Sequence, residues 1–446
     1  MSEELVNLKL KDTFCSSPWF HIRINPSGYY LPCRWDLSQF ESDHNIADTS
    51  ISEYMNSEVM RKTRMALLEG KIPDICVSCV YQDKMGKISG RKKQLLKSGI
   101  HTGMFEKTLC ASPHWSWFQQ SADNDGYTDC LPVDLQIDLG NTCNSACIMC
   151  IPTYSSKMAT DYKKLNPANP DIFPKFPQVK NWADDSQLVD KFVRELEQIP
   201  NIRYIHFLGG ETLFLKSFYD ICNRLIESGL SKDIIIGTTT NGTIYTEELD
   251  HIIKNFKHVH FGVSIETATN LNDYIRWPSK IETVLDNLNK FLKLKSDDNF
   301  YLSLRITPNI FSIYHIDSLL EFMIENSVTA ESCDLLRKPS WLRIENLPSN
   351  IKQEIINKLD NIIEKYQIDL SAEKVVNQRN DKIVPTVIAS TIKEYREFVS
   401  QCNEPDNVEE ERGRLVRFIK SFESLRNNKI LDYLPEYEDF LRNSGY

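Results

Sequence analysis

The sequence has no long hydrophobic run. No stretch of about 18 consecutive apolar residues occurs, so we expect no membrane-spanning helix. The N-terminal segment, which reads MSEELVNLKLKD, is charged and lacks the apolar core of a secretion signal. Internal repeats and low-complexity tracts are also missing. These absences argue against a membrane, secreted or repeat protein, and we expect a cytoplasmic location.

An excess of positive charge is missing as well. The chain carries 52 lysine and arginine residues against 62 acidic ones, a net charge of −10. This balance disfavours broad electrostatic attraction to nucleic acid, which we therefore do not expect as a partner. The 446 residues are 41% hydrophobic and 26% charged, which is typical of a globular protein with two or three domains.

Cysteine, in contrast, is abundant. The chain has twelve cysteines, and without a secretion signal this number indicates metal or redox chemistry in a reducing compartment. Three of them, Cys143, Cys147 and Cys150, follow a predicted strand at 133–139 with the spacing C-x3-C-x2-C. Three thiolates can hold three irons of a 4Fe–4S cube and leave the fourth iron open. A structural zinc site usually requires four protein ligands.

A second group of cysteines lies near the N-terminus. Cys15 and Cys33 flank a predicted hairpin at 20–31, and Cys76 and Cys79 form a C-x2-C pair after a predicted helix at 51–70. Four thiolates suit either a structural zinc ion or a fully ligated 4Fe–4S cluster, and the spacing alone does not separate the two.

From residue 133 onward, strand and helix patterns alternate about six times, which indicates a parallel α/β fold. The predicted strands are 133–139, 202–208, 233–237, 258–265, 300–307 and 328–336, and the predicted helices are 186–198, 215–229, 247–256, 281–294 and 316–326. In parallel barrels the chemistry lies at the carboxyl ends of the strands. The cysteine loop, Gly209-Gly210-Glu211, Thr240-Asn241-Gly242 and Ser264 all fall at such ends.

The cysteine loop and these motifs resemble the radical S-adenosylmethionine (radical SAM) enzymes. The usual family loop is C-x3-C-x-aromatic-C, and Met149 stands at the aromatic position here. Gly209-Gly210-Glu211 is similar to the family's GGE motif, although Thr212 stands where many relatives have proline. The resemblance implies an open partial barrel of six strand–helix units, related to a TIM barrel.

The same resemblance implies the ligands of the cofactors. Cys143, Cys147 and Cys150 would hold a 4Fe–4S cluster that binds SAM, and Glu211 would accept a hydrogen bond from the methionine amino group. The expected SAM-binding positions are Gly209, Gly210, Glu211, Thr240, Asn241, Ser264, Arg276 and Arg305. Two alternatives stay open: Asn241 also fits a plain Asn-Gly turn, and Arg276 also fits a structural salt bridge.

The N-terminal cysteines resemble the first half of a SPASM domain, called a twitch domain when truncated. The resemblance implies that Cys15, Cys33, Cys76 and Cys79 ligate one auxiliary 4Fe–4S cluster. The cysteines of a second half do not follow Cys79, and the module precedes the catalytic region instead of following it. A zinc ribbon remains the alternative for this site.

We therefore expect four regions: a cluster module at 1–100, a linker at 101–132, a radical SAM core at 133–340 and a helical extension at 341–446. The resemblance implies reductive cleavage of SAM, with an electron from a flavodoxin- or ferredoxin-like donor, and hydrogen abstraction from a substrate. A peptide or protein side chain is the leading substrate hypothesis. A nucleotide, sugar or other small metabolite and a non-catalytic iron–sulfur or zinc scaffold are the alternatives. No residue emerges as a catalytic acid or base.

Overall fold

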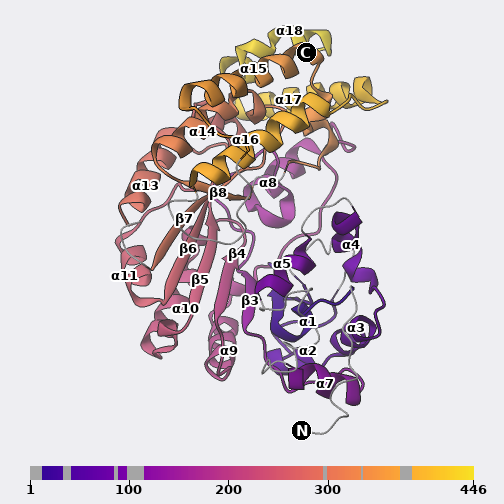
Figure 1. Ribbon diagram of the computed structural model, residues 1–446, viewed down its shortest axis with the longest axis vertical. Coiled ribbons are helices and arrows are strands. Elements are labelled where there is room, and N and C mark those ends of the chain that lie inside the picture. The colour runs from indigo at the N-terminus through magenta and orange to yellow at the C-terminus, as the bar shows by residue number, and fades with distance from the viewer. Residues whose placement is uncertain are drawn as a thin grey trace.

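The fold is organised around one eight-stranded sheet (Figure 1). The computed structural model describes residues 13–33, 42–84, 89–97, 115–294, 299–332, 335–371 and 384–446. The strand order is β2-β1-β3-β4-β5-β6-β7-β8, and β3 to β8 are parallel neighbours in chain order. The strands are β1 (His21–Ile24), β2 (Tyr30–Leu31), β3 (Asp134–Asp138), β4 (Tyr204–Leu208), β5 (Ile235–Thr240), β6 (His258–Ser264), β7 (Phe300–Arg305) and β8 (Thr329–Ser332).

Six parallel strands that do not close into a barrel confirm the expected α/β partial barrel. Within the described ranges, β2 and β8 form the two edges of the sheet and do not pair with each other. The two faces of β4 differ. Ile205 and Phe207 on one face are apolar and buried. The side chains on the other face are partly exposed: Tyr204, His206 and Leu208. This period of two is the reason that the segment forms a strand with one face in the core.

Helices follow the strands and cover the apolar face. They are α8 (Ser156–Leu165), α9 (Ser186–Glu197), α10 (Lys216–Glu227), α11 (Glu247–Asn255), α12 (Leu271–Ile275), α13 (Ile281–Lys293) and α14 (Ile316–Glu325). In α9, the buried residues Val189, Phe192, Val193 and Leu196 recur at helical spacing, and the Asp185 side chain caps the first turn. Gly229, with φ of 80°, ends the α10 segment in the left-handed region.

The N-terminal region is fused to the same sheet through β1. Strand β1 pairs antiparallel with β2 and parallel with β3, so the predicted hairpin extends the barrel sheet by two strands. This pairing brings residues 21–24 beside the strand that leads into the three-cysteine loop. The remaining N-terminal helices are α1 (Ser17–Phe20), α2 (Ile51–Met55), α3 (Glu58–Leu68), α4 (Val77–Lys84) and α5 (Gly90–Lys97).

The prediction of one helix at 51–70 was wrong, because α2 and α3 are separate helices. Helix α2 ends at Asn56. The Asn56 side-chain Nδ2 donates to the Thr128 carbonyl, and its Oδ1 accepts a hydrogen bond from the Thr128 N–H. Helix α2 begins with a capping box formed by Ser50 and Glu53. The local periodicity is helical throughout, and a distant backbone partner interrupts it.

The predicted linker contains a helix, α7 (Trp115–Asp123). Its Trp115 and Phe118 side chains are buried in a second hydrophobic cluster with Phe14 and Trp19. These aromatic residues therefore form part of a core beside the sheet.

The C-terminal extension is helical, as expected. It consists of α15 (Ser349–Tyr366), α16 (Val384–Gln401), α17 (Val408–Arg426) and α18 (Glu438–Asn443). Figure 1 shows these helices, in orange and yellow, gathered at the end of the molecule beyond β8 and α8. In the parts of the chain that the structure describes, no helix combines the length and apolarity needed to cross a bilayer.

Candidate functional site

The three-cysteine loop begins directly after β3. Cys143, Cys147 and Cys150 are free thiols, and Cys147 is 9% exposed. Burial raises the pKa of all three thiols, to about 12 for Cys143, and neighbouring sulfurs of the same loop add to the effect at Cys143 and Cys150. Thiols in this setting stay neutral unless a cation compensates their charge. The donor set therefore fits an iron–sulfur cluster, whose irons bind and stabilise thiolates.

Backbone hydrogen bonds fix the shape of this loop. Ala146 N–H donates to the Trp277 carbonyl at 2.7 Å, and Ile148 N–H donates to the Ile275 carbonyl at 2.9 Å. The loop is thus tied to the segment that follows β6. Ser155 adds a side-chain bond from its hydroxyl to the Ser145 carbonyl at 2.8 Å.

The two glycines of the GGE motif allow a close approach between loops. A Cβ on Gly209 would lie 2.4 Å from the Gly140 carbonyl oxygen, and a Cβ on Gly210 would lie 1.9 Å from the Thr142 carbonyl oxygen. Both residues have positive φ, 100° and 33°. The loop after β4 therefore packs directly against the backbone that carries Cys143, and only glycine fits at the contact.

Glu211 joins the ends of β4 and β5. Its carboxylate is buried and accepts hydrogen bonds from Thr240 Oγ1 at 2.6 Å, Asn241 N–H at 2.6 Å and Leu213 N–H at 3.1 Å. Burial raises the pKa of Glu211, while these three donors act in the opposite direction. The carboxylate thus organises the Thr240-Asn241 turn, a structural role that the sequence did not reveal.

Asn241 contacts the cysteine loop itself. Its side-chain amide donates to Asn144 Oδ1 at 2.6 Å and to Ser145 Oγ at 3.1 Å. Asn144 in turn donates to Thr243 Oγ1 at 2.8 Å. These bonds exceed what a plain Asn-Gly turn requires, and they bring the third-strand motif to the two residues between Cys143 and Ala146.

Arg276 also contacts the three-cysteine loop. It donates to Glu266 Oε1 at 2.5 Å and to Cys147 Sγ at 3.7 Å, and it is 9% exposed. Glu266 also accepts from Thr307 N–H at 3.0 Å. The salt-bridge alternative for Arg276 is therefore present, and its second contact places a guanidinium beside a cluster thiol.

Ser264 and Arg305 end adjacent strands. They are register partners of β6 and β7, and both are partly exposed. A Cβ on Gly262 would lie 2.6 Å from Arg305 Nε, so the missing side chain at Gly262 makes room for the arginine. Asn309, beyond β7, caps its own turn by accepting a hydrogen bond from Phe311 N–H at 3.1 Å.

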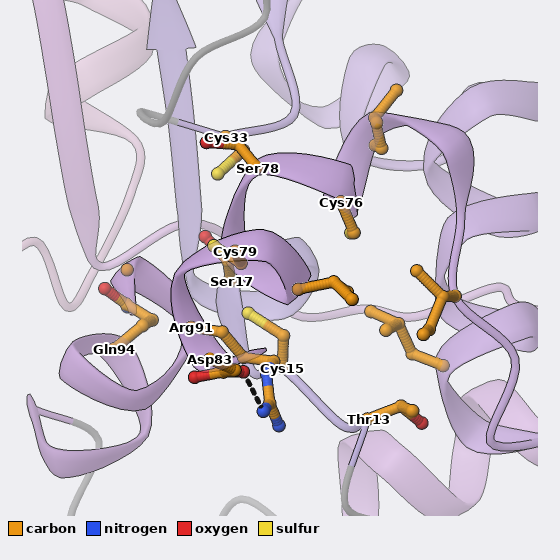
Figure 2. A pocket seen from close by; sticks show the side chains of 15 residues that line it. Thr13, Cys15, Ser17, Cys33, Cys76, Ser78, Cys79, Asp83, Arg91 and Gln94 are labelled. Carbon is orange, nitrogen blue, oxygen red and sulfur yellow. Dashed lines mark hydrogen bonds and ion pairs between the residues drawn. The ribbon is translucent and has the colours of Figure 1, made fainter. Parts of the chain in front are cut away.

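The four N-terminal cysteines line one cavity of about 340 Å³ (Figure 2). Cys15 precedes α1, Cys33 follows β2, and Cys76 and Cys79 lie at the start of α4. Burial raises the pKa of Cys15 and Cys79, and raises that of Cys76 to about 12. The backbone N–H groups of Arg91 and Gly90 oppose this effect on the pKa of Cys79. Four thiols around a shared cavity fit a cluster with four protein ligands.

Further cysteines of the chain do not belong to the two predicted ligand sets. Cys222 is buried in α10 and Cys402 follows α16, whereas Cys110 and Cys333 fall outside the described residues. His206 accepts or donates a hydrogen bond with Tyr204 at 2.9 Å on the exposed face of β4. Neither Cys222 nor Cys402 lines the cavity of the four N-terminal cysteines.

Two charged contacts near the three-cysteine loop escaped the sequence analysis. Arg23 of β1 donates to buried Asp138 at 2.6 Å, at the end of β3, and to Tyr154 at 3.1 Å. Arg426 of α17 donates to the Ala146 carbonyl at 2.8 Å. Asp138 stands at a polar position of a strand in which polar and apolar residues alternate, so the sequence did not indicate that it is buried. Nothing in the local sequence marks Arg426.

Comparison with known proteins agrees with these two sites. Residues 137–308 match the sequence profile of the Radical SAM superfamily. Residues 15–80 match the profile of SPASM, an iron–sulfur cluster-binding domain. The matched ranges contain both cysteine sets. No curated protein sequence matches the chain.

Solved structures with some similarity were also found. "Native anSMEcpe with bound AdoMet" is 15% identical, with a TM-score of 0.38 over 53% of this chain and 62% of that one. SuiB of Streptococcus suis bound to S-adenosylmethionine is 14% identical, with a TM-score of 0.33 over 80% and 71%. SuiB bound to precursor peptide SuiA is 14% identical, with a TM-score of 0.36 over 79% and 70%.

This chain therefore spans less than two thirds of the length of anSMEcpe, the first of these structures. The family assignment depends on the two profile matches, which agree with the motifs and with the open parallel sheet. Residues 137–308 form a domain of the radical SAM superfamily and residues 15–80 form a SPASM-type iron–sulfur domain; the cofactors of these domains are a 4Fe–4S cluster, an auxiliary 4Fe–4S cluster and S-adenosylmethionine.

Proposed function

We propose that this protein is a radical SAM enzyme that modifies a side chain of a peptide or protein. The observation that carries the proposal is the meeting of three motifs at the carboxyl ends of β3, β4 and β5. There the cysteine loop contacts Gly210 through packing and Asn241 through hydrogen bonds. When bound, the cluster and SAM supply a 5′-deoxyadenosyl radical that takes a hydrogen atom from the substrate.

Residues of this chain would bind the cluster and SAM and keep the cysteine loop in position. Cys143, Cys147 and Cys150 would ligate three irons and leave the fourth for the amino and carboxylate groups of SAM. Glu211 and Asn241 keep the loop in place through the bonds to Thr240 and Asn144. The further SAM contacts that we propose are Gly209, Gly210, Glu211, Thr240, Asn241, Ser264, Arg276 and Arg305.

Cys15, Cys33, Cys76 and Cys79 would ligate the auxiliary cluster. We propose that it accepts an electron from the substrate radical or binds the substrate. Support comes from the sheet: β1, which follows Cys15 closely, pairs directly with β3, which leads to Cys143. Both sites are therefore attached to adjacent strands of one rigid element.

The substrate class is an analogy with SPASM-domain maturases, and the SPASM match at 15–80 is its support. A nucleotide, sugar or other small metabolite is the alternative, and a non-catalytic scaffold is the alternative of another class. A flavodoxin- or ferredoxin-like protein would supply the electron.

Anaerobic reconstitution with SAM and a reductant tests the proposal. The wild-type chain should form 5′-deoxyadenosine, and Cys143→Ala should abolish this product because one cluster ligand is lost. Cys76→Ala should keep the product but block turnover of the true substrate. Cys402→Ala is the matched control, since this thiol lies outside both sites. A wild-type chain that binds iron but forms no 5′-deoxyadenosine would support the scaffold alternative.

A further inference from the structure

The C-terminal helix α17 reaches the three-cysteine loop through Arg426. The guanidinium Nη2 donates to the Ala146 carbonyl and to Asp161 Oδ2, both at 2.8 Å. Ala146 immediately precedes Cys147, and its N–H is already held by the Trp277 carbonyl. Both backbone polar groups of Ala146 are therefore fixed, one of them by a side chain 280 residues away.

Arg426 is enclosed on all sides. Its side chain is 2% exposed, and its guanidinium carbon lies 4.8 Å from the Trp277 ring centre and 4.0 Å from that of Phe422. Cation–π contacts of this kind are stronger when water is excluded. Burial lowers the pKa of Arg426, and the bond to Asp161 opposes this effect. An arginine side chain nevertheless keeps its positive charge in proteins.

Helix α17 is anchored beside the loop by contacts that do not involve Arg426. Phe173 packs against Phe418 and Phe422, with ring centres 5.8 and 5.4 Å apart. Arg417 donates to Asp171 at 2.7 Å. The helix would therefore remain in place if Arg426 were replaced.

A second cation, Arg276, contacts Cys147 directly. Arg276 donates to the Cys147 sulfur, and its guanidinium is buried like that of Arg426. Arg426 binds the carbonyl of Ala146, the residue directly before Cys147. Two fixed positive charges thus act on one predicted cluster ligand in a region of low dielectric, where charge interactions are strong.

We propose that Arg426 is a positioning residue of the SAM cluster, through which α17 holds the cysteine loop and favours the reduced cluster. This inference depends on the proposed function, because it requires a cluster on Cys143, Cys147 and Cys150. Reduction adds one electron to a site already surrounded by thiolates. A nearby fixed cation stabilises that extra negative charge and so raises the reduction potential.

Redox titration followed by electron paramagnetic resonance tests this role, using the cluster signal that changes when SAM is added. Arg426→Gln removes the cation and should shift the midpoint potential to a more negative value. Asp161→Asn removes the neighbouring anion and should shift it the opposite way. Arg417→Gln, on the same helix but in an exposed salt bridge, should leave it unchanged. A general structural defect does not produce shifts of opposite sign.

Equal potentials in the wild type, Arg426→Gln and Asp161→Asn, or shifts of the same sign, would overturn the proposal. If Arg426→Gln loads no iron, Arg426→Lys takes its place: this variant keeps the charge and should keep the wild-type potential, with Asp161→Asn still more positive. The proposal would also be overturned if the potential of Arg426→Lys differed from that of the wild type, or if the potential of Asp161→Asn were not more positive. Absence of any SAM-sensitive signal in the wild type would overturn both this inference and the proposed function, whereas a failure confined to the variants would affect Arg426 alone.

Discussion

Single residues decide whether the cysteine loop can form its contacts. The sequence motifs predicted which residues meet: Gly210, Asn241 and Arg276 all lie against the loop that carries the cysteines. Their partners could not be predicted, because each bond depends on the relative placement of two strand ends. Glu211 shows this most clearly, since its carboxylate accepts bonds from Thr240 and Asn241 within the protein.

Gly210→Ala should prevent cluster loading. The added Cβ would lie 1.9 Å from the Thr142 carbonyl oxygen, and the positive φ adds strain, so the loss of stability should exceed about 1 kcal/mol. Gly413→Ala is the matched control, because nothing lies within 4 Å of its Cβ position in α17. It should raise stability by roughly 0.5–1 kcal/mol through helix propensity. Iron content and thermal unfolding measure both effects. Normal iron content in Gly210→Ala would contradict the packing argument.

At the scale of elements, periodicity predicted the barrel well. The predicted strand at 258–265 and helix at 281–294 differ from β6 and α13 by one residue at one end. Periodicity failed where a distant partner decides the structure. The Asn56 side chain donates to the Thr128 carbonyl at the end of α2, and β1 pairs with β3 in the sheet. Neither pairing leaves a local pattern in the sequence.

The ion pair between β1 and β3 should contribute strongly to stability. Arg23→Met leaves Asp138 buried without its cation, which should cost roughly 3 kcal/mol. Arg417→Met removes an exposed partner of Asp171 and should lower stability much less, because solvent screens this ion pair. Chemical denaturation compares the two variants. Equal losses would show that burial does not govern the pair.

The loss of stability in the Arg23→Met variant should depend on pH. Burial raises the pKa of Asp138, and Arg23 opposes this effect, so Arg23→Met should raise the pKa of Asp138 further. A carboxyl group with a raised pKa in the folded state destabilises the fold when it is ionised. The loss should therefore be greatest above that pKa and become smaller as the pH falls through it. A loss that grows on acidification would contradict this assignment.

At the scale of the whole molecule, the sheet connects two cysteine sites that are far apart in the sequence. Cys15 to Cys79 belong to the region fused through β1, and Cys143 to Cys150 follow β3. From the C-terminal extension, α17 reaches the cysteine loop through Arg426. The sequence indicated no site in residues 341–446, because Arg426 is a single arginine within an ordinary amphipathic helix.

The presence of two separate clusters is the central claim, and Mössbauer spectroscopy of the anaerobically reconstituted chain tests it most directly. The wild type should show two 4Fe–4S clusters, one of which responds to SAM. The triple variant Cys143→Ala, Cys147→Ala, Cys150→Ala should keep one cluster and lose the SAM response. Two clusters in the triple variant, or a wild type whose only cluster ignores SAM, would contradict the assignment of these cysteines.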